Sequence, residues 1–219
     1  MAKKVKSKSW LLIVAIVAFS SWIYQRDSEF NEGFVGQGLN DVSELKVKGD
    51  YEVLNGCSLT KNRRNDGDSF FVKHPKGETE FRLYYVDAPE SRYREYANGD
   101  TNGKRIHAQG TYFGGLDRET TTDLGAKGKR FVADLLGSRP FSVITRWENV
   151  FSPERRYAFV IVEHHGKQVF LHEILIEMGY ARIHTKPATM PDGGNIKLQL
   201  KKLRLLEKSA KNAKLGGWQ

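Results

Sequence analysis

The sequence contains a single cysteine, Cys57, among 219 residues. One cysteine cannot form an intrachain disulfide, and it excludes metal centres that need several thiolate ligands. The six histidines include no pair at the spacing of metal ligands on a helix face, so we expect neither a zinc site nor a catalytic histidine. The chain also has no internal repeat, and we therefore do not expect a repeat architecture.

Long apolar runs are equally scarce, and the one that is present lies at the N-terminus. Four lysines among the first eight residues are followed by an uncharged segment from Ser9 to Gln25. This pattern is typical of a signal peptide, but the segment is also just long enough for a spanning helix with Trp22 and Tyr24 as interfacial anchors. Residues 1–25 are therefore expected to be a signal peptide or a signal anchor. Both alternatives export the rest of the chain, either as a secreted or periplasmic protein or held at the membrane through residues 9–25.

Charge of one sign is only moderately in excess. The formal net charge is +9, from 35 Lys and Arg against 26 Asp and Glu, but four of the lysines belong to the N-terminal segment. The remaining excess favours polyanionic partners only weakly. A hydrophobic content of 39% with 11% aromatic residues supports a packed core and argues against a disordered chain.

Three carboxylates are concentrated at one predicted β-hairpin. The arms are rich in aromatic and β-branched residues, and residues 74–77 (His-Pro-Lys-Gly) supply turn chemistry between them. If Lys73 pairs with Thr79, Asp68 faces Tyr84, and the second strand ends near Asp87 because Pro89 cannot donate to the ladder.

The same register brings Asp68, Asp87 and Glu90 to one end of the hairpin, with Arg82 one strand-length back. Carboxylates at such short range repel one another unless a cation or a proton intervenes. A hard divalent metal ion with oxygen ligands is therefore expected at this end of the hairpin.

The combined pattern, Asp-Gly-Asp-Ser at 66–69 with Phe-Arg-Leu-Tyr-Tyr-Val-Asp-Ala-Pro-Glu at 81–90, resembles the signature of the staphylococcal nuclease-like (thermonuclease) family. The resemblance implies that Asp68 and Asp87, with the backbone carbonyl of Ala88, hold one calcium ion, Mg²⁺ and Mn²⁺ being the less favoured choices. It also implies that Arg82 binds the scissile phosphate and that Glu90 orients or activates the attacking water.

A second arginine motif follows at residues 155–160, Arg-Arg-Tyr-Ala-Phe-Val. By resemblance to the family, Arg155 is the second catalytic arginine, with Arg156 as the alternative because Pro153-Glu154 replaces the usual Tyr-Gly before it. The aromatic residues that stack on the nucleotide are also not matched, since Thr185 and Pro187 stand in that stretch. Base binding is therefore expected either to be weak or to be supplied by tyrosines of an insertion, namely Tyr93, Tyr96 or Tyr112.

The order of predicted elements is strand, hairpin, helix, hairpin, helix, helix. Residues 26–50 read as a linker, and residues 51–219 as the nuclease-like domain, interrupted by the insertion at 91–123. The helices are expected at 125–136, at about 171–178 and from Ile196 onward, with a short one at 104–113 inside the insertion. This order, together with the resemblance, predicts an α+β fold, a five-stranded Greek-key barrel of the OB type packed with about three helices.

The predicted function is that of an exported, monomeric, calcium-dependent nuclease that hydrolyses phosphodiester bonds in DNA or RNA. The main alternative is a binding module, because OB-type domains also bind single strands without chemistry. An anchored structural protein is a third alternative, and it leaves the carboxylate cluster unexplained.

Overall fold

The structure is a computed structural model, and it describes residues 38–219. The predicted export segment, 1–25, and the first part of the predicted linker lie outside the described residues. Within the described range, no helix combines the length and the apolar character that crossing a membrane requires.

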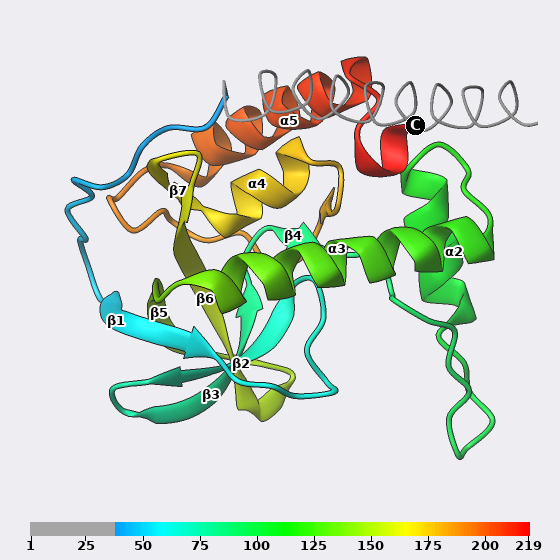
Figure 1. Ribbon diagram of the computed structural model, residues 1–219, viewed down its shortest axis with the longest axis horizontal. Coiled ribbons are helices and arrows are strands. Elements are labelled where there is room, and N and C mark those ends of the chain that lie inside the picture. Colours follow the sequence, from blue (N-terminus) through cyan, green and yellow to red (C-terminus); the bar gives the residue numbers. More distant parts are fainter. Residues whose placement is uncertain (1–37) are drawn as a thin grey trace, which may run out of the picture. The chain divides into compact units, whose positions relative to one another are not determined.

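Five strands form a closed mixed β-barrel (Figure 1). They are β1 (Glu52–Leu59), β2 (Ser69–His74), β3 (Gly77–Leu83), β5 (Phe141–Val150) and β6 (Ser152–His164), in the order β3-β2-β1-β5-β6. All neighbours in this order are antiparallel, and a parallel pairing of β3 with β6 closes the barrel. The α+β barrel predicted from the sequence is therefore confirmed, and it is consistent with an OB-type fold.

Three short strands lie outside the barrel. β7 (Lys167–Phe170) extends β6 as a hairpin, while β4 (Val86–Asp87) and β8 (Arg182–Ile183) form a separate two-stranded sheet. The β4–β8 pair matters for the site because it places Asp87 directly opposite Arg182.

Aromatic side chains fill the barrel. Phe70, Phe81 and Phe159 are buried, and Tyr84 stacks on Tyr157 with 4.9 Å between ring centroids. Stacked and tilted aromatic pairs of this kind add to the free energy gained from burying their area. The strands that carry the predicted site residues are therefore anchored in a rigid core.

Four α-helices pack around the barrel in the described residues, where about three were predicted. They are α2 (Gly103–Tyr112), α3 (Arg118–Ser138), α4 (Leu171–Glu177) and α5 (Ile196–Asn212), followed by the short 3₁₀ helix η1 (Gly216–Trp218). α3 begins well before the predicted Gly125, because the Asp117 side chain caps it by accepting a hydrogen bond of 2.7 Å from the Thr120 amide. α2 pairs with α3, and α4 with α5 (Figure 1).

The predicted register of the β2–β3 hairpin is wrong by one residue. Lys73 pairs with Glu78 rather than Thr79, because the turn closes with His74 opposite Gly77. Gly77 has φ 129°, a backbone conformation that favours glycine at the end of this tight turn. Asp68 consequently lies beside Leu83, whose amide donates a 2.9 Å hydrogen bond to the Asp68 carbonyl.

The second arm of the hairpin also ends earlier than predicted. β3 stops at Leu83, and Tyr85 adopts φ 71°, which turns the chain away from the barrel. Asp87 therefore belongs to β4 and not to the hairpin strand. Pro89, which we expected to end that strand, follows β4 instead.

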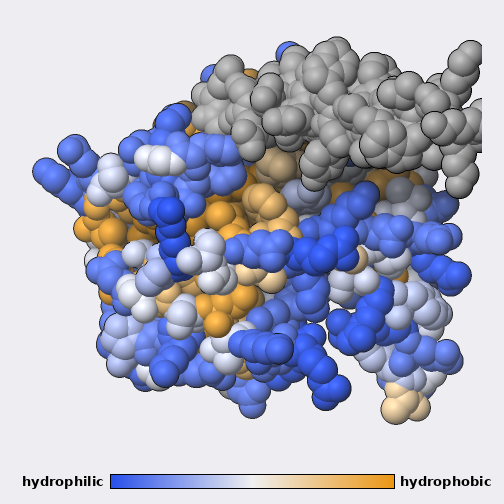
Figure 2. Space-filling model, viewed as in Figure 1, coloured by the Kyte–Doolittle hydropathy of each residue, from blue (hydrophilic) through white to orange (hydrophobic). Residues whose placement is uncertain are grey.

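The insertion at 91–123 forms an arm, helix α2 and the first turn of α3. The arm turns at Asn98-Gly99-Asp100, closes with a bridge between Glu95 and Thr101, and projects away from the barrel (Figure 1). The view in Figure 2 shows mainly hydrophilic surface over β2 and β3, with hydrophobic residues gathered around part of α3. In the described part of the predicted linker, Leu39 is buried in the core of the domain.

Candidate active site

The loop before β2 brings Asp68 against the chain that leaves β4. Gly67 makes this approach possible, because a Cβ at that position would lie 2.8 Å from the Cβ of Ala88. The Ala88 amide then donates a 2.7 Å hydrogen bond to Asp68 Oδ2. Asp68 and Ala88, both predicted site residues, are thus in direct contact.

Arg82 lies between the two predicted metal-binding aspartates. Its Nη1 is 3.1 Å from Asp68 Oδ1, and its Nη2 donates a 2.8 Å hydrogen bond to Asp87 Oδ1. Burial lowers the pKa of Arg82, but the charges of Asp68 and then Asp87 outweigh it, and the pKa is raised. The single guanidinium of Arg82 therefore forms ion pairs with two buried carboxylates.

The two aspartates differ in how well their charges are compensated. Burial raises the pKa of Asp68, Arg82 lowers it, and the neighbouring charge of Asp87 raises it again, so that the net shift is upward. Burial also raises the pKa of Asp87, but Arg105, a hydrogen bond from Gln109, Arg82 and Arg182 together lower it below its ordinary value. Asp68 is the carboxylate that gains most from an additional positive charge.

Asp87 is fully buried and accepts hydrogen bonds from three arginines and one glutamine. Oδ1 accepts from Arg82 and from Arg105, whose Nη2 lies 2.5 Å away. Oδ2 accepts from Arg182 Nε at 2.8 Å and from Gln109 Nε2 at 3.0 Å. Such charge-assisted hydrogen bonds hold the carboxylate in one orientation.

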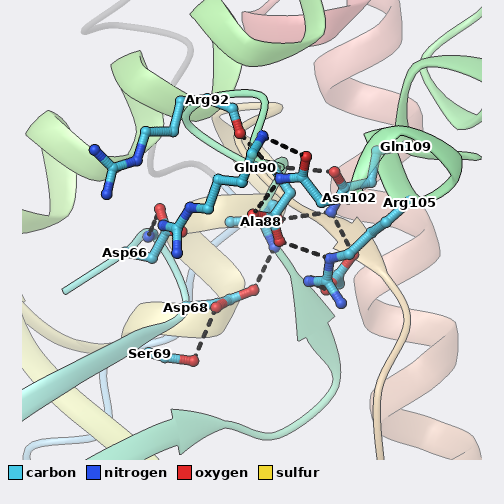
Figure 3. Close-up of polar contacts among 12 residues, drawn as sticks. Asp66, Asp68, Ser69, Ala88, Glu90, Arg92, Asn102, Arg105 and Gln109 are labelled. Atoms are coloured by element: carbon cyan, nitrogen blue, oxygen red, sulfur yellow. Dashed lines mark hydrogen bonds and ion pairs between the residues drawn. The ribbon is translucent and has the colours of Figure 1, made fainter. Parts of the chain in front are cut away.

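Glu90 is held by the insertion. Its carboxylate lies 2.8 Å from Arg105 Nε and accepts a 3.2 Å hydrogen bond from Asn102 Nδ2, while its amide donates to Gln109 Oε1 at 3.0 Å. Figure 3 shows Asn102, Arg105 and Gln109 gathered beside Glu90 and Ala88. Helix α3 passes directly beneath this turn, because position 125 is glycine and a Cβ there would lie 2.4 Å from the Pro89 carbonyl oxygen.

The parallel pairing of β3 with β6 places Arg155 on the site. Arg155 stands opposite Glu80 in the register, and its Nε is 3.1 Å from Glu80 Oε1. Arg64 Nη2 is 2.7 Å from the other oxygen of Glu80, so that this buried carboxylate fixes two arginines. Arg156 points elsewhere and donates to Asn149 Oδ1. The structure thus places Arg155, and not its alternative, with Arg82.

Two cavities adjoin these residues. The larger has a volume of about 870 Å³ and is lined by Arg82, Asp87, Arg105 and Arg155 together with the β5–β6 turn and residues 184–186. The smaller, of about 230 Å³, has a polar lining that includes Asp68, Glu90, Arg82 and Arg155. All the predicted catalytic side chains therefore face solvent-accessible space.

Of the three tyrosines proposed for nucleotide contacts, only Tyr96 lines one of these cavities, the smaller. Tyr93 lies under the guanidinium of Arg118, with 4.9 Å from Cζ to the ring centroid. Tyr112 packs against Trp218 and donates a hydrogen bond to Glu207.

Sequence reasoning missed Arg105, Gln109 and Arg182. Arg105 and Gln109 are four residues apart on a predicted helix, a spacing that puts both side chains on one face and could have identified them as a pair. Arg182 carries no comparable signal, because only the β4–β8 pairing brings it to Asp87.

The oxygen donors at this site match a hard cation in type but are already engaged. Asp87 accepts four hydrogen bonds, and the Ala88 carbonyl accepts one from Gln109. Arg82 lies between Asp68 and Asp87. Two carboxylates, Asp68 and Asp87, and the Ala88 carbonyl are ligands of the type that calcium binds. Burial, followed by repulsion from Asp68, raises the pKa of the neighbouring Asp66 to about 6. Within residues 38–219, no three His, Cys, Asp or Glu side chains form a metal site by themselves, so solvent or substrate oxygens would complete the ligand set.

No protein-family model matches this sequence, and a comparison with curated proteins finds no significant match. The function is therefore inferred from the residues of the site and from the sequence pattern that they share.

Proposed function

We propose that this chain is a calcium-dependent nuclease that hydrolyses phosphodiester bonds in DNA or RNA. The observation that carries the proposal is the position of Arg82, which joins two buried aspartates and faces Arg155 across the barrel closure at an open cleft. A structural ion-pair network would not need to face a large cleft. Guanidinium groups that converge on open space are suited to a phosphate.

In the proposed reaction, Arg82 and Arg155 hold the non-bridging oxygens of the phosphate. Both side chains are fixed by carboxylates, Arg82 by Asp68 and Asp87, and Arg155 by Glu80. Positive charge held in place before the reaction stabilises the negative charge that develops during phosphoryl transfer.

Glu90 acts on the water. As the water oxygen forms a bond to phosphorus, Glu90 accepts a proton, the bond from phosphorus to the leaving oxygen breaks, and that oxygen takes a proton from solvent. Gln109 and Asn102 hold the backbone and the carboxylate of Glu90 in position. A calcium ion held by Asp68, Asp87 and the Ala88 carbonyl would polarise the phosphate and neutralise part of its charge.

Three further features predicted from the sequence are part of the same proposal. They are the Greek-key connectivity of an OB-type barrel, a monomeric state, and export through residues 1–25. Sequencing the N-terminus of the mature protein distinguishes a cleaved signal peptide from an anchor, because cleavage removes the apolar segment.

The test is single-turnover cleavage measured beside equilibrium binding, with the full chain and single-stranded DNA, in calcium and in excess chelator. Glu90→Gln keeps the shape and removes the base, and Arg82→Ala removes the phosphate contact. Each should lower kcat by about 10²–10³-fold. Glu163→Gln, far along β6 and paired with Arg139, is the matched control and should cut like wild type.

Two outcomes contradict the proposal in different ways. A wild-type protein that binds the strand but does not cut it in calcium is a binding module and not a nuclease. Full activity in excess chelator leaves the nuclease intact but removes calcium from its mechanism.

A further inference from the structure

Arg105 belongs to the insertion and contacts both Asp87 and the proposed base Glu90. It lies on α2, and its guanidinium bridges Asp87 Oδ1 at 2.5 Å and Glu90 Oε1 at 2.8 Å. Even so, 41% of its side chain is exposed, compared with 12% for Arg82 and 29% for Arg155. Its side chain is therefore the most exposed of the three.

Arg105 also lies where the two cavities of the site meet. Among the described residues, only Arg82, Arg105 and Arg155 line both the 870 Å³ cleft and the 230 Å³ polar cavity. Two of these three are the arginines to which the proposed function gives the phosphate. The third, Arg105, borders the same two cavities and comes from a segment outside the resemblance to known nucleases.

The existing contacts of Arg105 leave donors for a further acceptor. A guanidinium has five N–H donors, and the contacts to Asp87 and Glu90 involve Nη2 and Nε. Asp87 does not depend on Arg105 alone, because Arg82, Arg182 and Gln109 also donate to it. Asp87 would therefore keep three other donors if Arg105 also bound a ligand.

We propose that Arg105 is a third phosphate-binding residue, and that Arg82, Arg105 and Arg155 together hold one phosphate of a single strand. The proposal rests on the proposed function for the class of ligand but not for the hydrolysis. A phosphodiester linkage supplies the anionic oxygens that guanidinium groups bind. The insertion is thereby part of the substrate site through Arg105.

The experiment is a cycle of variants and ligands, measured by calorimetry on the full chain in excess chelator. The ligands are a thymidine dinucleotide with its ordinary charged linkage and the same dinucleotide with a neutral methylphosphonate linkage. Arg105→Gln should weaken binding of the charged dinucleotide by about tenfold or more, the effect of losing one charge-assisted hydrogen bond, and leave the neutral one unchanged. Arg105→Lys should retain part of the affinity, because a point charge replaces a planar fork.

The matched control is Lys104→Gln, which removes the same charge from the adjacent, exposed position of α2 and lines neither cavity. It should bind both dinucleotides like wild type. If Arg105→Gln and Lys104→Gln lost the same affinity, Arg105 would act only through the net charge of the surface. If Arg105→Gln lost the same affinity for the charged and the neutral dinucleotide, its role would be structural. Either result overturns the proposal, as does a wild type that does not prefer the charged linkage.

Failure of the proposed function is seen separately. A wild type that shows the expected dependence on Arg105 but does not cut a longer strand in calcium would contradict the nuclease and support the phosphate contact.

Discussion

Gly125→Ala tests whether the close approach of α3 to the Pro89–Glu90 turn positions the proposed base. In a helix interior, glycine is less favourable than alanine by about 0.8–1.0 kcal/mol, so the substitution normally stabilises a protein. Here the new Cβ would lie 2.4 Å from the Pro89 carbonyl oxygen and 2.5 Å from that of Glu90. Both are backbone atoms, and neither can turn aside as the end of a side chain could.

The overlap should outweigh the gain in helix propensity. Forcing one extra methyl group into a packed contact costs about 1–3 kcal/mol, against a gain of about 1 kcal/mol at most. We therefore expect a net loss of up to about 2 kcal/mol in the free energy of unfolding. For a domain of this size the melting temperature would fall by about 2–4 °C per kcal/mol.

Gly137→Ala is the matched control because it lies in the same helix and its Cβ would meet no atom within 4 Å. It should raise the melting temperature slightly. The measurement is thermal unfolding of both variants, followed by the kcat for single-stranded DNA. Gly125→Ala should also lose activity, because the turn that carries Glu90 has to shift. If both variants were equally stabilised, the helix and the turn would not be in contact as described, and the reasoning would be refuted.

Three other substitutions probe the remaining parts of the site and the core. Arg155→Ala should lower kcat by about 10²–10³-fold while Arg156→Ala changes it little, as measured by single-turnover cleavage. Gln109→Ala removes the donor to the Ala88 carbonyl and the acceptor for the Glu90 amide. It should therefore lower kcat and lower the free energy of unfolding, measured in urea, by about 1–3 kcal/mol. Burial, followed by the charge of Lys202, lowers the pKa of His172 from 6.5 to about 3, so the unfolded chain takes up its proton first as the pH falls. Stability should therefore decrease between about pH 6.5 and 3, by up to about 1.4 kcal/mol per pH unit, and His172→Gln should reduce this slope in urea unfolding.

The sequence predicts best the site residues that lie in short motifs. The sequence predicts that Asp68 and Asp87 lie near each other, with Arg82 one strand-length back. The structure keeps the two aspartates close despite the error in register, but it places Arg82 between them, in contact with both. Arg155 could be chosen only provisionally over Arg156. Strand alternation sends neighbouring side chains to opposite faces, and only the β3–β6 register determines which one meets Glu80.

The errors arise where the tertiary structure overrides local pattern. Residues 81–86 are apolar or aromatic except for Arg82, a composition that predicts one strand, yet the chain breaks at Tyr85 with φ 71°. The break is stabilised by contacts distant in sequence, since the Tyr85 amide donates to the Lys186 carbonyl and its own carbonyl accepts from the His184 amide. No periodicity within the run could indicate those partners.

The insertion changes how the site is built. Asp68, Arg82 and Arg155 are positioned by barrel strands and the loops beside them, whereas Glu90 is held by Asn102, Arg105 and Gln109 from the insertion. Arg82 and Arg155 on the one hand and the proposed base on the other therefore depend on different parts of the fold. A perturbation of α2 should impair the action on water while leaving the barrel and its two arginines in place. Shortening the insertion to a simple loop would then abolish cleavage through Glu90, and not only weaken nucleotide binding as a role confined to its tyrosines would require.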